Sequence, residues 1–418
     1  MTDKADYVAL DDAEDPLVLA LDIGSTASRG GVYDSTGRPI KELRHKEPHT
    51  FTSRADGTSE IDPDQVTAEV EQILDALTGE HSLRERITGL AMDTFAASLV
   101  AVDGDGRPLT SCMTYADSRC AAQVAALRAE LDEHAVQQHT GTRIHTSYHA
   151  PRLRWLAETS PETFAATAGW WSLGEYVFSR LRGDTAAGTS TAAWTGLLDR
   201  RTGQLDDALL EASGARRDQF SPIHDVPDPL PPTSTRWRAL EQASWFPVIP
   251  DGFASNYGAG ATDRARIAAA TATSGALRVL LDAPADPLPF GLWNYRVDGS
   301  RTLLGGALND VGRAVSWARS VLDLGEDLEP VLTADPSAGT PLVLPYLTGE
   351  RAPGWMATAQ AMLAGVTAAT TPEDLFRGII EGVAITYARV ASDLTPAAPE
   401  ARQIMAAGSV SKDLPDWL

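Results

Sequence analysis

The sequence predicts an α/β protein with two domains. The chain has 418 residues, of which 43% are hydrophobic, and this exceeds the size at which one hydrophobic core usually keeps growing. Short apolar runs that predict strands alternate with amphipathic helical segments, which is typical of α/β domains. A strand, a glycine-containing turn and a second strand also occur once in each half of the chain. Such a repeat indicates two related domains that face a cleft.

Composition suggests where the domains begin and end. Residues 1–15 are acidic and polar and predict a disordered leader. We expect a first domain over residues 16–245 and a second over residues 246–418. The proline-rich stretch 225–245 is the expected crossing between them.

Charge and cysteine content narrow the range of functions. The formal net charge of −22 disfavours nucleic acid or an anionic membrane surface as the main partner. Cys112 and Cys120 stand apart from any His or Cys cluster, so they predict neither a zinc site nor a disulfide framework and favour a reducing cytoplasm. The sequence contains no signal-peptide pattern and no apolar run near the roughly 18 residues of a membrane span.

Periodicity predicts the main elements between these features. Residues 61–77 carry an apolar helical face with Asp64 as the expected cap, and residues 118–138 form an alanine-rich helical pattern. Residues 87–102 predict two strands around the sequence MDTFAAS. The strongest helix begins at Pro372 after the cap Thr371.

The first strand, turn and strand, residues 17–34, form a candidate phosphate site. Asp22 ends the apolar strand, and Gly24 lets the backbone come close to a ligand. Ser25 and Thr26 supply hydroxyl and amide donors, and Arg29 adds a positive charge. This set suits a magnesium-bound polyphosphate, because hard cations take oxygen ligands and phosphates take clustered donors. An ordinary hairpin turn built from Gly and Ser is the alternative.

The same pattern of strand, small-residue turn, arginine and strand recurs in the second half as IAAATATSGALRVLL, residues 267–281. There, Arg278 follows Arg29 by about 250 residues. Chance resemblance between two Gly/Ser turns is the alternative. Farther along, Gly305 and Gly306 predict a glycine turn before an amphipathic helix.

Histidines occur in an expected loop before another helix, at His145 and His149 on either side of Tyr148. A single histidine in such a loop is more often structural than catalytic, and the spacing matches no metal signature.

Four ordered motifs resemble the FGGY carbohydrate kinases. LDIGSTASR resembles the family's first phosphate loop, TATSGA the second, LPYLTGERAP the carboxy-lobe signature and AAGSVSK the start of the adenine loop. Within the family, the sequence is most similar to gluconokinase-type members. The resemblance implies a two-domain, actin-like ATPase fold of ribonuclease-H type, with a cleft between the lobes. It also implies ATP and Mg²⁺ as cofactors and leaves a homodimer open.

The resemblance also implies roles for individual residues. Asp22 would hold magnesium through water, and Asp251, in the Asp-Gly pair that opens the second lobe, would be the catalytic base. The implied substrate-binding residues are Thr94, Phe95, Ala97, Tyr148, Asp251 and Gly252. The implied phosphate- and ATP-binding residues are Gly24, Ser25, Thr26, Arg29, Thr273, Ser274, Gly275, Gly305, Gly306, Gly408 and Ser409. A turn aspartate after Pro250 is the structural alternative for Asp251.

The sequence departs from the family pattern at three places. Ala96 and Ala97 stand where gluconokinases have Trp-His, and Ala272 replaces the glycine that usually precedes the threonine of the second phosphate loop. Family members also continue for several dozen residues past the adenine loop, so we expect a second lobe that is shortened at its C-terminus.

The resulting hypothesis is an ATP-dependent sugar or sugar-acid kinase, with gluconate as the favoured substrate. A kinase for another pentulose, polyol or cyclitol is the first alternative. The second alternative is a shortened, catalytically idle relative that binds nucleotide or sugar.

Overall fold

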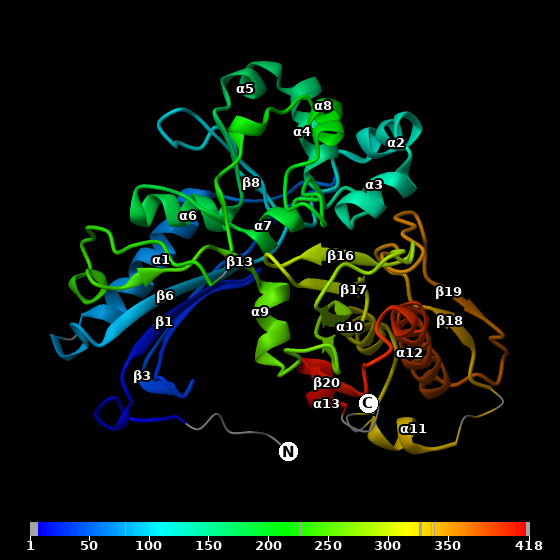
Figure 1. Cartoon of the computed structure of the whole chain (residues 1–418). Coiled ribbons are helices and arrows are strands. Elements are labelled where there is room, and N and C mark those ends of the chain that lie inside the picture. The colour runs from blue at the N-terminus through cyan, green and yellow to red at the C-terminus, as the bar shows by residue number, and fades with distance from the viewer. Residues whose placement is uncertain are drawn as a thin grey trace. The chain divides into compact units, whose positions relative to one another are not determined.

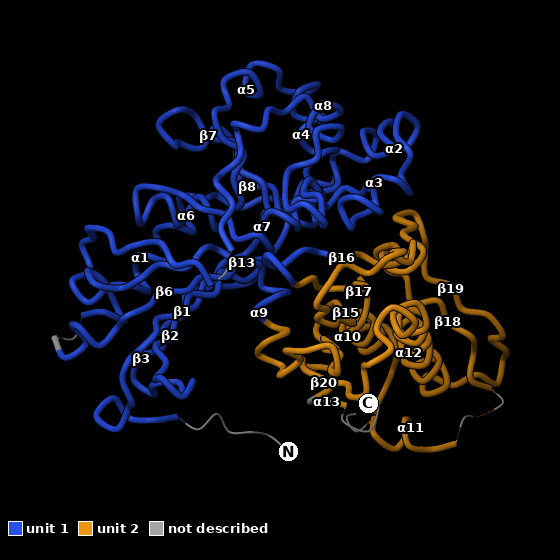
Figure 2. Tube along the Cα trace, viewed as in Figure 1, with its two compact units in different colours: residues 1–254, 295–300 blue, residues 255–294, 301–418 orange. Residues whose placement is uncertain are grey.

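A computed structural model of the chain describes residues 7–79, 81–225, 227–325, 328–335, 337 and 339–414. It divides into two compact units, shown in Figure 2. The first unit comprises Met1–Ala254 and Tyr295–Ser300, and the second comprises Ser255–Asn294 and Arg301–Leu418. The chain therefore leaves the first unit about ten residues after the expected boundary at 245, and returns to it once.

The first unit is built on a sheet in the order β12-β6-β1-β2-β3, with β13 also paired to β6 (Figure 1). Its strands are β1 (Leu17–Ile23), β2 (Ala27–Tyr33), β3 (Pro39–Pro48), β6 (Ile87–Thr94), β12 (Ser244–Trp245) and β13 (Ile249–Pro250). Helix α1 (Pro63–Thr78) packs against β2 and β3, and α6 (Leu173–Arg182) packs against α1 and β6.

The remaining elements of the first unit are smaller. They are η1 (Leu10–Asp12), β4 (Thr52–Ser53), β5 (Ser59–Ile61), η2 (His81–Leu83), β7 (Val100–Val102), β8 (Cys112–Met113), α2 (Ala121–Glu130), α3 (Glu133–Thr140), α4 (His149–Thr159), α5 (Pro161–Ala166), β9 (Gly169–Trp171), β10 (Ala187–Gly188), α7 (Thr189–Trp194), α8 (Asp207–Ser213), η3 (Arg217–Gln219), β11 (Ile223–His224) and η4 (Arg238–Leu240). Helix α9 (Asp251–Gly258) begins in this unit and ends in the second.

Strand β1 forms because every second residue is apolar and buried. Leu17, Leu19, Leu21 and Ile23 are each at most 2% exposed and belong to the core of the first unit. This period of two places the intervening residues on the other face of the sheet. Asp22 is one of them, so the pattern that buries the strand also leaves its carboxylate accessible.

The second unit contains a sheet in the order β16-β17-β15-β14-β20. Its elements are β14 (Arg266–Thr271), β15 (Gly275–Leu281), β16 (Trp293–Arg296), β17 (Thr302–Leu308), α10 (Gly312–Val321), α11 (Glu329–Thr333), β18 (Leu342–Leu344), β19 (Met362–Ala364), α12 (Pro372–Ala397), β20 (Gln403–Ala407) and α13 (Ser409–Asp413). The last two residues of β16 are assigned to the first unit. Helix α12, orange to red in Figure 1, packs on β15, β17 and α10.

The two sheets share one arrangement, which confirms the repeated hairpin. In the first unit, β2 pairs antiparallel with β1, and β6 pairs parallel with β1 on the other side. In the second unit, β15 pairs antiparallel with β14, and β20 pairs parallel with β14. The glycine-containing turns therefore occupy equivalent positions in the two units.

The start and centre of the first unit differ from the sequence predictions. Residues 7–15 were expected in a disordered leader, but Val8 is buried and its backbone bonds Pro39 and Lys41, while Asp15 pairs with Arg86 at 2.8 Å. Residues 1–6 lie outside the described part of the chain. The prediction that residues 225–245 connect the two domains is also wrong. Trp245, at the end of this stretch, is fully buried and belongs to strand β12, which pairs with β6 inside the first unit.

Two predicted helices need correction at their caps. Helix α1 is capped by Asp62, whose side chain accepts a hydrogen bond from the backbone of the expected cap Asp64 at 2.9 Å. The expected helix over residues 118–138 is two helices, α2 and α3. They separate because the side chain of Asp132 accepts hydrogen bonds from the backbone N–H groups of His134 and Ala135 and starts α3.

One buried histidine makes the first unit sensitive to acid. His149, the first residue of α4, is 2% exposed, and among the described residues its Nδ1 has no hydrogen-bond partner. Burial, helped by the charge of Arg152, lowers the pKa of His149 from 6.5 to about 3. The unfolded chain therefore binds a proton between these values that the folded chain does not bind.

We expect the free energy of unfolding to fall as the pH drops below about 6.5, by at most about 1.4 kcal/mol per pH unit from this residue. His149→Gln removes this titration and should flatten the decline between pH 7 and 5 in urea unfolding. The matched control is His139→Gln, because the His139 side chain is 57% exposed. If the free energy of unfolding fell as steeply with pH in the His149 variant as in the wild type, the assignment of this decline to His149 would be wrong.

Candidate active site

Three carboxylates belong to one edge of the sheet in the first unit. Asp22 and Asp93 are direct partners in the parallel ladder between β1 and β6. On the other side of β6, Ile249 of β13 pairs with Asp93, and Asp251 follows that strand by one residue. Because the carboxyl ends of parallel strands meet at one edge of a sheet, strand order brings these acids together.

The pKa of Asp93 records this proximity. Desolvation, the negative charges of Asp22 and Asp251 and a hydrogen bond with the Asp22 carboxyl raise the pKa of Asp93 to about 8, while Arg29 opposes the shift. A strongly raised carboxyl pKa beside other acids is a frequent mark of a functional site. Asp93 was not among the residues implied by the sequence. It stands in MDTF at the end of an expected strand, but only the pairing of β6 with β1 reveals its neighbours.

Arg29 and Gly24 complete this edge. The Arg29 Nη1 atom lies 3.0 Å from Asp22 Oδ2, across the ladder that makes the two residues partners. Gly24 is buried, and its backbone N–H donates to the carbonyl of Ala27 at 3.0 Å, which closes the turn. A Cβ on Gly24 would lie 3.0 Å from Arg29 Nη1. A side chain at position 24 would therefore press on the guanidinium that reaches Asp22.

Ser25 and Thr26 occupy the turn itself. Ser25 is half-buried and Thr26 is exposed, so their side chains are open to a ligand. The carbonyl of Thr26 accepts the backbone N–H of His49 at 3.1 Å.

The implied substrate residues lie close in sequence but in different surroundings. Thr94 ends β6, is buried, and its Oγ1 has no hydrogen-bond partner in the described part of the chain. Phe95 is buried beneath Phe51, with ring centroids 5.1 Å apart. Ala97 has a positive φ of 56°, and its carbonyl accepts a hydrogen bond from Arg152 at 2.5 Å. Phe95 is therefore a core residue, and Thr94 points to the opposite face of the strand from Asp93, toward Gly174 of α6.

Tyr148 makes a different contact. It immediately precedes α4, is buried, and its hydroxyl lies 2.6 Å from the hydroxyl of Tyr295. The ring of Tyr295 stacks on Trp194 with centroids 3.7 Å apart. Tyr148 therefore attaches the returning segment 295–300 to the rest of the first unit.

The aspartate implied as the base begins helix α9. Asp251 is exposed, and its Oδ1 accepts the backbone N–H of Gly252 at 2.7 Å. Gly252 is buried. Asp251 is thus an exposed residue at the strand edge that also carries Asp22.

In the second unit, Thr273, Ser274 and Gly275 form the equivalent turn between β14 and β15. Thr273 and Ser274 are exposed, and Gly275 is buried where a Cβ would overlap the hydroxyl of Tyr387. The carbonyl of Thr273 accepts backbone N–H groups from Val311 and Arg313 at 3.2 and 3.1 Å. The start of α10 therefore holds this turn through its carbonyls and leaves its hydroxyls exposed.

Gly408 and Ser409 lie beside the same turn. Gly408 has a φ of +137°, and a Cβ on it would overlap the carbonyl of Thr271. Thr273 and Ser409 both line a pocket of about 430 Å³ in this unit, with Gly312, Val315, Ser316, Arg319, Val410 and Leu414. The structure thus brings the two implied nucleotide segments of the second unit together.

Gly305 and Gly306 do not form a turn. They lie buried within strand β17, where a Cβ on Gly305 would overlap the neighbouring strand and one on Gly306 would press on Val390 and Ala352. Both glycines therefore allow close packing of β17. The predicted turn is therefore wrong, while the implied role of the two glycines in phosphate binding stays a prediction.

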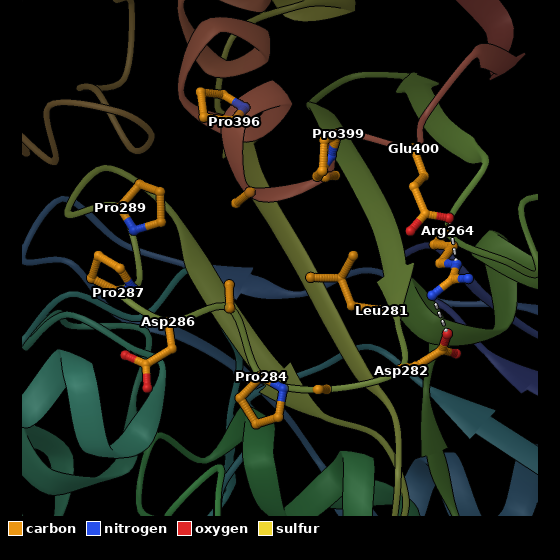
Figure 3. Close-up of a pocket in the computed structure, with 14 residues that line it drawn as sticks. Arg264, Leu281, Asp282, Pro284, Asp286, Pro287, Pro289, Pro396, Pro399 and Glu400 are labelled. Carbon is orange, nitrogen blue, oxygen red and sulfur yellow. Dashed lines mark ion pairs between the residues drawn. The ribbon is translucent and has the colours of Figure 1, made fainter.

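A second pocket of the second unit, of about 540 Å³, is shown in Figure 3. Its lining is rich in proline, and Arg264 at its side is paired with Asp282 at 3.1 Å and Glu400 at 2.7 Å. None of the implied site residues lines it. Because its arginine is already neutralised by two acids, this pocket has little to offer an anionic ligand.

Comparison with known proteins agrees with this arrangement. Models of the FGGY family of carbohydrate kinases match the chain in two parts, the N-terminal domain at residues 17–227 and the C-terminal domain at residues 269–415. The fold is that of the two-domain actin-like ATPases. The chain belongs to the FGGY family of carbohydrate kinases, which makes it a phosphotransferase that acts on a sugar hydroxyl and uses ATP.

Individual relatives have low identity. The gluconokinase of Bacillus subtilis (strain 168) is 26% identical over 384 residues, which cover 88% of this chain and 74% of that protein. The xylulose kinase of Escherichia coli (strain K12) is 24% identical over 388 residues, covering 89% of this chain and 77% of that protein. The solved gluconate kinase of Lactobacillus acidophilus is 27% identical with a TM-score of 0.86, covering 95% of this chain and 82% of that one. The predicted shortening of the second lobe stays a prediction.

The donor set of the first unit fits a magnesium ion held mainly through water. Within the described ranges, no three His, Cys, Asp or Glu side chains form a ready-made metal site. Mg²⁺ usually keeps several waters and binds one or two carboxylates together with substrate phosphates. Asp22 supplies one carboxylate of that kind, and Asp93, which shares a hydrogen bond with it, lies beside it. Separately, no helix in the described part of the chain has the length and apolar character needed to cross a membrane.

The close approach of Arg29 to position 24 can be tested directly by mutation. We expect Gly24→Ala to push the Arg29 guanidinium away from Asp22 and to raise KM for ATP about tenfold, as for the loss of a charge-assisted contact. Steady-state kinetics measure this. The control is Gly104→Ala, because an added Cβ there has no neighbouring atom within 4 Å and no positive φ. If the two folded variants had equal KM values for ATP, the proposed effect of a side chain at position 24 would be wrong.

Proposed function

We propose that this kinase transfers the terminal phosphate of ATP to a hydroxyl of a sugar acid, with gluconate as the leading acceptor. The observation that carries the proposal is the convergence of Asp22, Asp93 and Asp251 at one strand edge beside Arg29 and the Gly24 turn. The gluconokinases among the relatives support the acceptor.

In the proposed reaction, Asp251 is the general base. The attacking hydroxyl forms a bond to the γ-phosphorus, the bond from that phosphorus to the bridging oxygen breaks, and ADP leaves. The hydroxyl proton passes to the Asp251 carboxylate. An exposed carboxylate at the start of a helix, fixed by the N–H of Gly252, is suited to this task.

The phosphates are proposed to bind two sets of donors. In the first unit these are the Gly24–Thr26 turn and Arg29, and in the second they are Thr273, Ser274 and Gly275, with Gly408 and Ser409 nearer the adenine. A bound Mg²⁺ would neutralise phosphate charge, with Asp22 as its protein ligand through water. Asp93, which shares a hydrogen bond with Asp22, would hold that carboxylate in place.

Xylulose is the second candidate acceptor. Relatives named xylulose kinase match almost the whole chain, and Ala96 and Ala97 remove from the expected sugar pocket the large side chains of the gluconokinase pattern. A panel of gluconate, xylulose, glycerol and other polyols and cyclitols, read by a coupled ADP assay, distinguishes the acceptors. Binding of Mg·ATP without ADP release on the whole panel would favour an idle binding relative.

The base assignment predicts a large loss of rate. Asp251→Asn keeps the size of the side chain but removes the proton acceptor, so we expect kcat to fall about a hundredfold or more. KM for ATP should change much less, because this carboxylate is not proposed to bind the phosphates. Steady-state kinetics with the best acceptor of the panel measure both values.

A matched control is Asp218→Asn, which removes a carboxylate that is 74% exposed and pairs with surface Arg216. We expect it to retain the wild-type rate. If the folded Asp251 variant turned over as fast as this control, the assignment of the base would be wrong.

A further inference from the structure

The buried residue His49 is hydrogen-bonded to the Gly24–Thr26 turn. The backbone N–H of His49 donates to the carbonyl of Thr26 at 3.1 Å, and its ring Nε2 lies 2.9 Å from the carbonyl oxygen of Gly24. The His49 side chain is completely buried. A single residue just after β3 therefore contacts both ends of the three-residue turn.

The other ring nitrogen of His49 is held by a glutamate of helix α1. His49 Nδ1 lies 2.8 Å from Glu69 Oε2, and the same oxygen accepts a hydrogen bond from Ser28 Oγ at 2.9 Å. Glu69 Oε1 accepts from Gln65 at 2.9 Å. Burial acts to raise the pKa of Glu69, but hydrogen bonds from His49, Gln65 and Ser28 outweigh it and hold that pKa below its ordinary value. Glu69 is therefore an ionised carboxylate.

These contacts determine the protons on the ring. A backbone carbonyl can only accept a hydrogen bond, and so can an ionised carboxylate. Nε2 must therefore donate to the Gly24 carbonyl, and Nδ1 would donate to an ionised Glu69, which together would make the ring an imidazolium. The cation is compensated by the Glu69 carboxylate at hydrogen-bond distance, as a buried charge requires. The ring of Phe51 stacks on it, with centroids 6.2 Å apart.

The anchored carbonyls also orient the donors of the turn. In a planar trans peptide, the C=O of one residue and the N–H of the next point in opposite directions. With the Gly24 carbonyl held by the His49 ring, the N–H of Ser25 points away from it. The Thr26 carbonyl, held by the His49 backbone, fixes the N–H of Ala27 in the same way. The side of the turn opposite His49 is therefore the side that offers N–H groups.

We propose that His49, as an imidazolium held by Glu69, is a positioning residue that fixes the Gly24–Thr26 turn for the phosphates of the nucleotide. The proposal rests on the proposed function of this turn in phosphate binding. His49 touches neither nucleotide nor sugar, and it acts through the Gly24 carbonyl. Its positive charge behind the turn also favours an anion in front of it.

Nitrogen NMR tests the charge of the ring without any activity. In ¹⁵N-histidine-labelled protein at pH 7.5, the signals that vanish in His49→Gln belong to His49. We expect both nitrogens to appear as protonated, donor-type nitrogens. We expect Glu69→Gln, which removes the counter-charge, to convert one of them to the unprotonated type. A wild-type spectrum with one unprotonated nitrogen would overturn the imidazolium.

Nucleotide affinity tests the positioning role. We expect His49→Gln and Glu69→Gln each to weaken Mg·ADP binding about tenfold in calorimetry, with KM for the acceptor nearly unchanged. His139→Gln, which removes the ring of an exposed histidine 3.8 Å from Asp206, is the matched control and should bind as wild type. Thermal unfolding identifies any variant that fails to fold. A folded His49→Gln with wild-type affinity would overturn the role.

The two proposals can fail separately. If wild-type protein phosphorylated no acceptor on the panel, the proposed function would be wrong, while the nitrogen spectrum and the ADP affinities would still decide the role of His49.

Discussion

The parallel pairing of β1 with β6 is the constraint on which the candidate site depends. Backbone hydrogen bonds fix the register, and the register makes Asp22 and Asp93 neighbours despite their repulsion. Because β6 also pairs with β13, the chain must bring Asp251 to the same edge. The raised pKa of Asp93 is the electrostatic consequence of a fold that places acids together before any cation is bound.

Positive charge at this edge is supplied locally, since the chain as a whole carries a formal charge of −22. Arg29 faces Asp22 from the front of the hairpin, and the proposed imidazolium of His49 lies behind the turn. Each has its own carboxylate, Asp22 for the arginine and Glu69 for the histidine. Pairing keeps each cation in one geometry without ligand, so that a polyphosphate would meet an ordered set of donors.

Much of the fold could be predicted from local pattern, because the alternation of Leu17, Leu19 and Leu21 is enough to specify a buried strand and Thr371–Pro372 enough to start a helix. Asp93 could not be found in this way, since its neighbours come from strands about 70 and 155 residues away. The turn predicted at Gly305–Gly306 was wrong because two adjacent glycines fit a turn and a crowded strand equally well. The prolines before Trp245 indicated a linker between domains. The segment instead belongs to the first unit, where the Trp245 side chain is fully buried.

The two hairpins share one topology but differ in the residues that face their arginines. In the first, Arg29 faces Asp22 across the ladder, whereas in the second the ladder partner of Arg278 is Ala268. The second turn instead exposes Thr273 and Ser274, and the start of α10 holds it through its carbonyls. An acid beside the second turn would repel phosphate without serving as a base. Under the proposed function, the acids act in the first unit, and the exposed hydroxyls of Thr273 and Ser274 are neutral donors to the nucleotide.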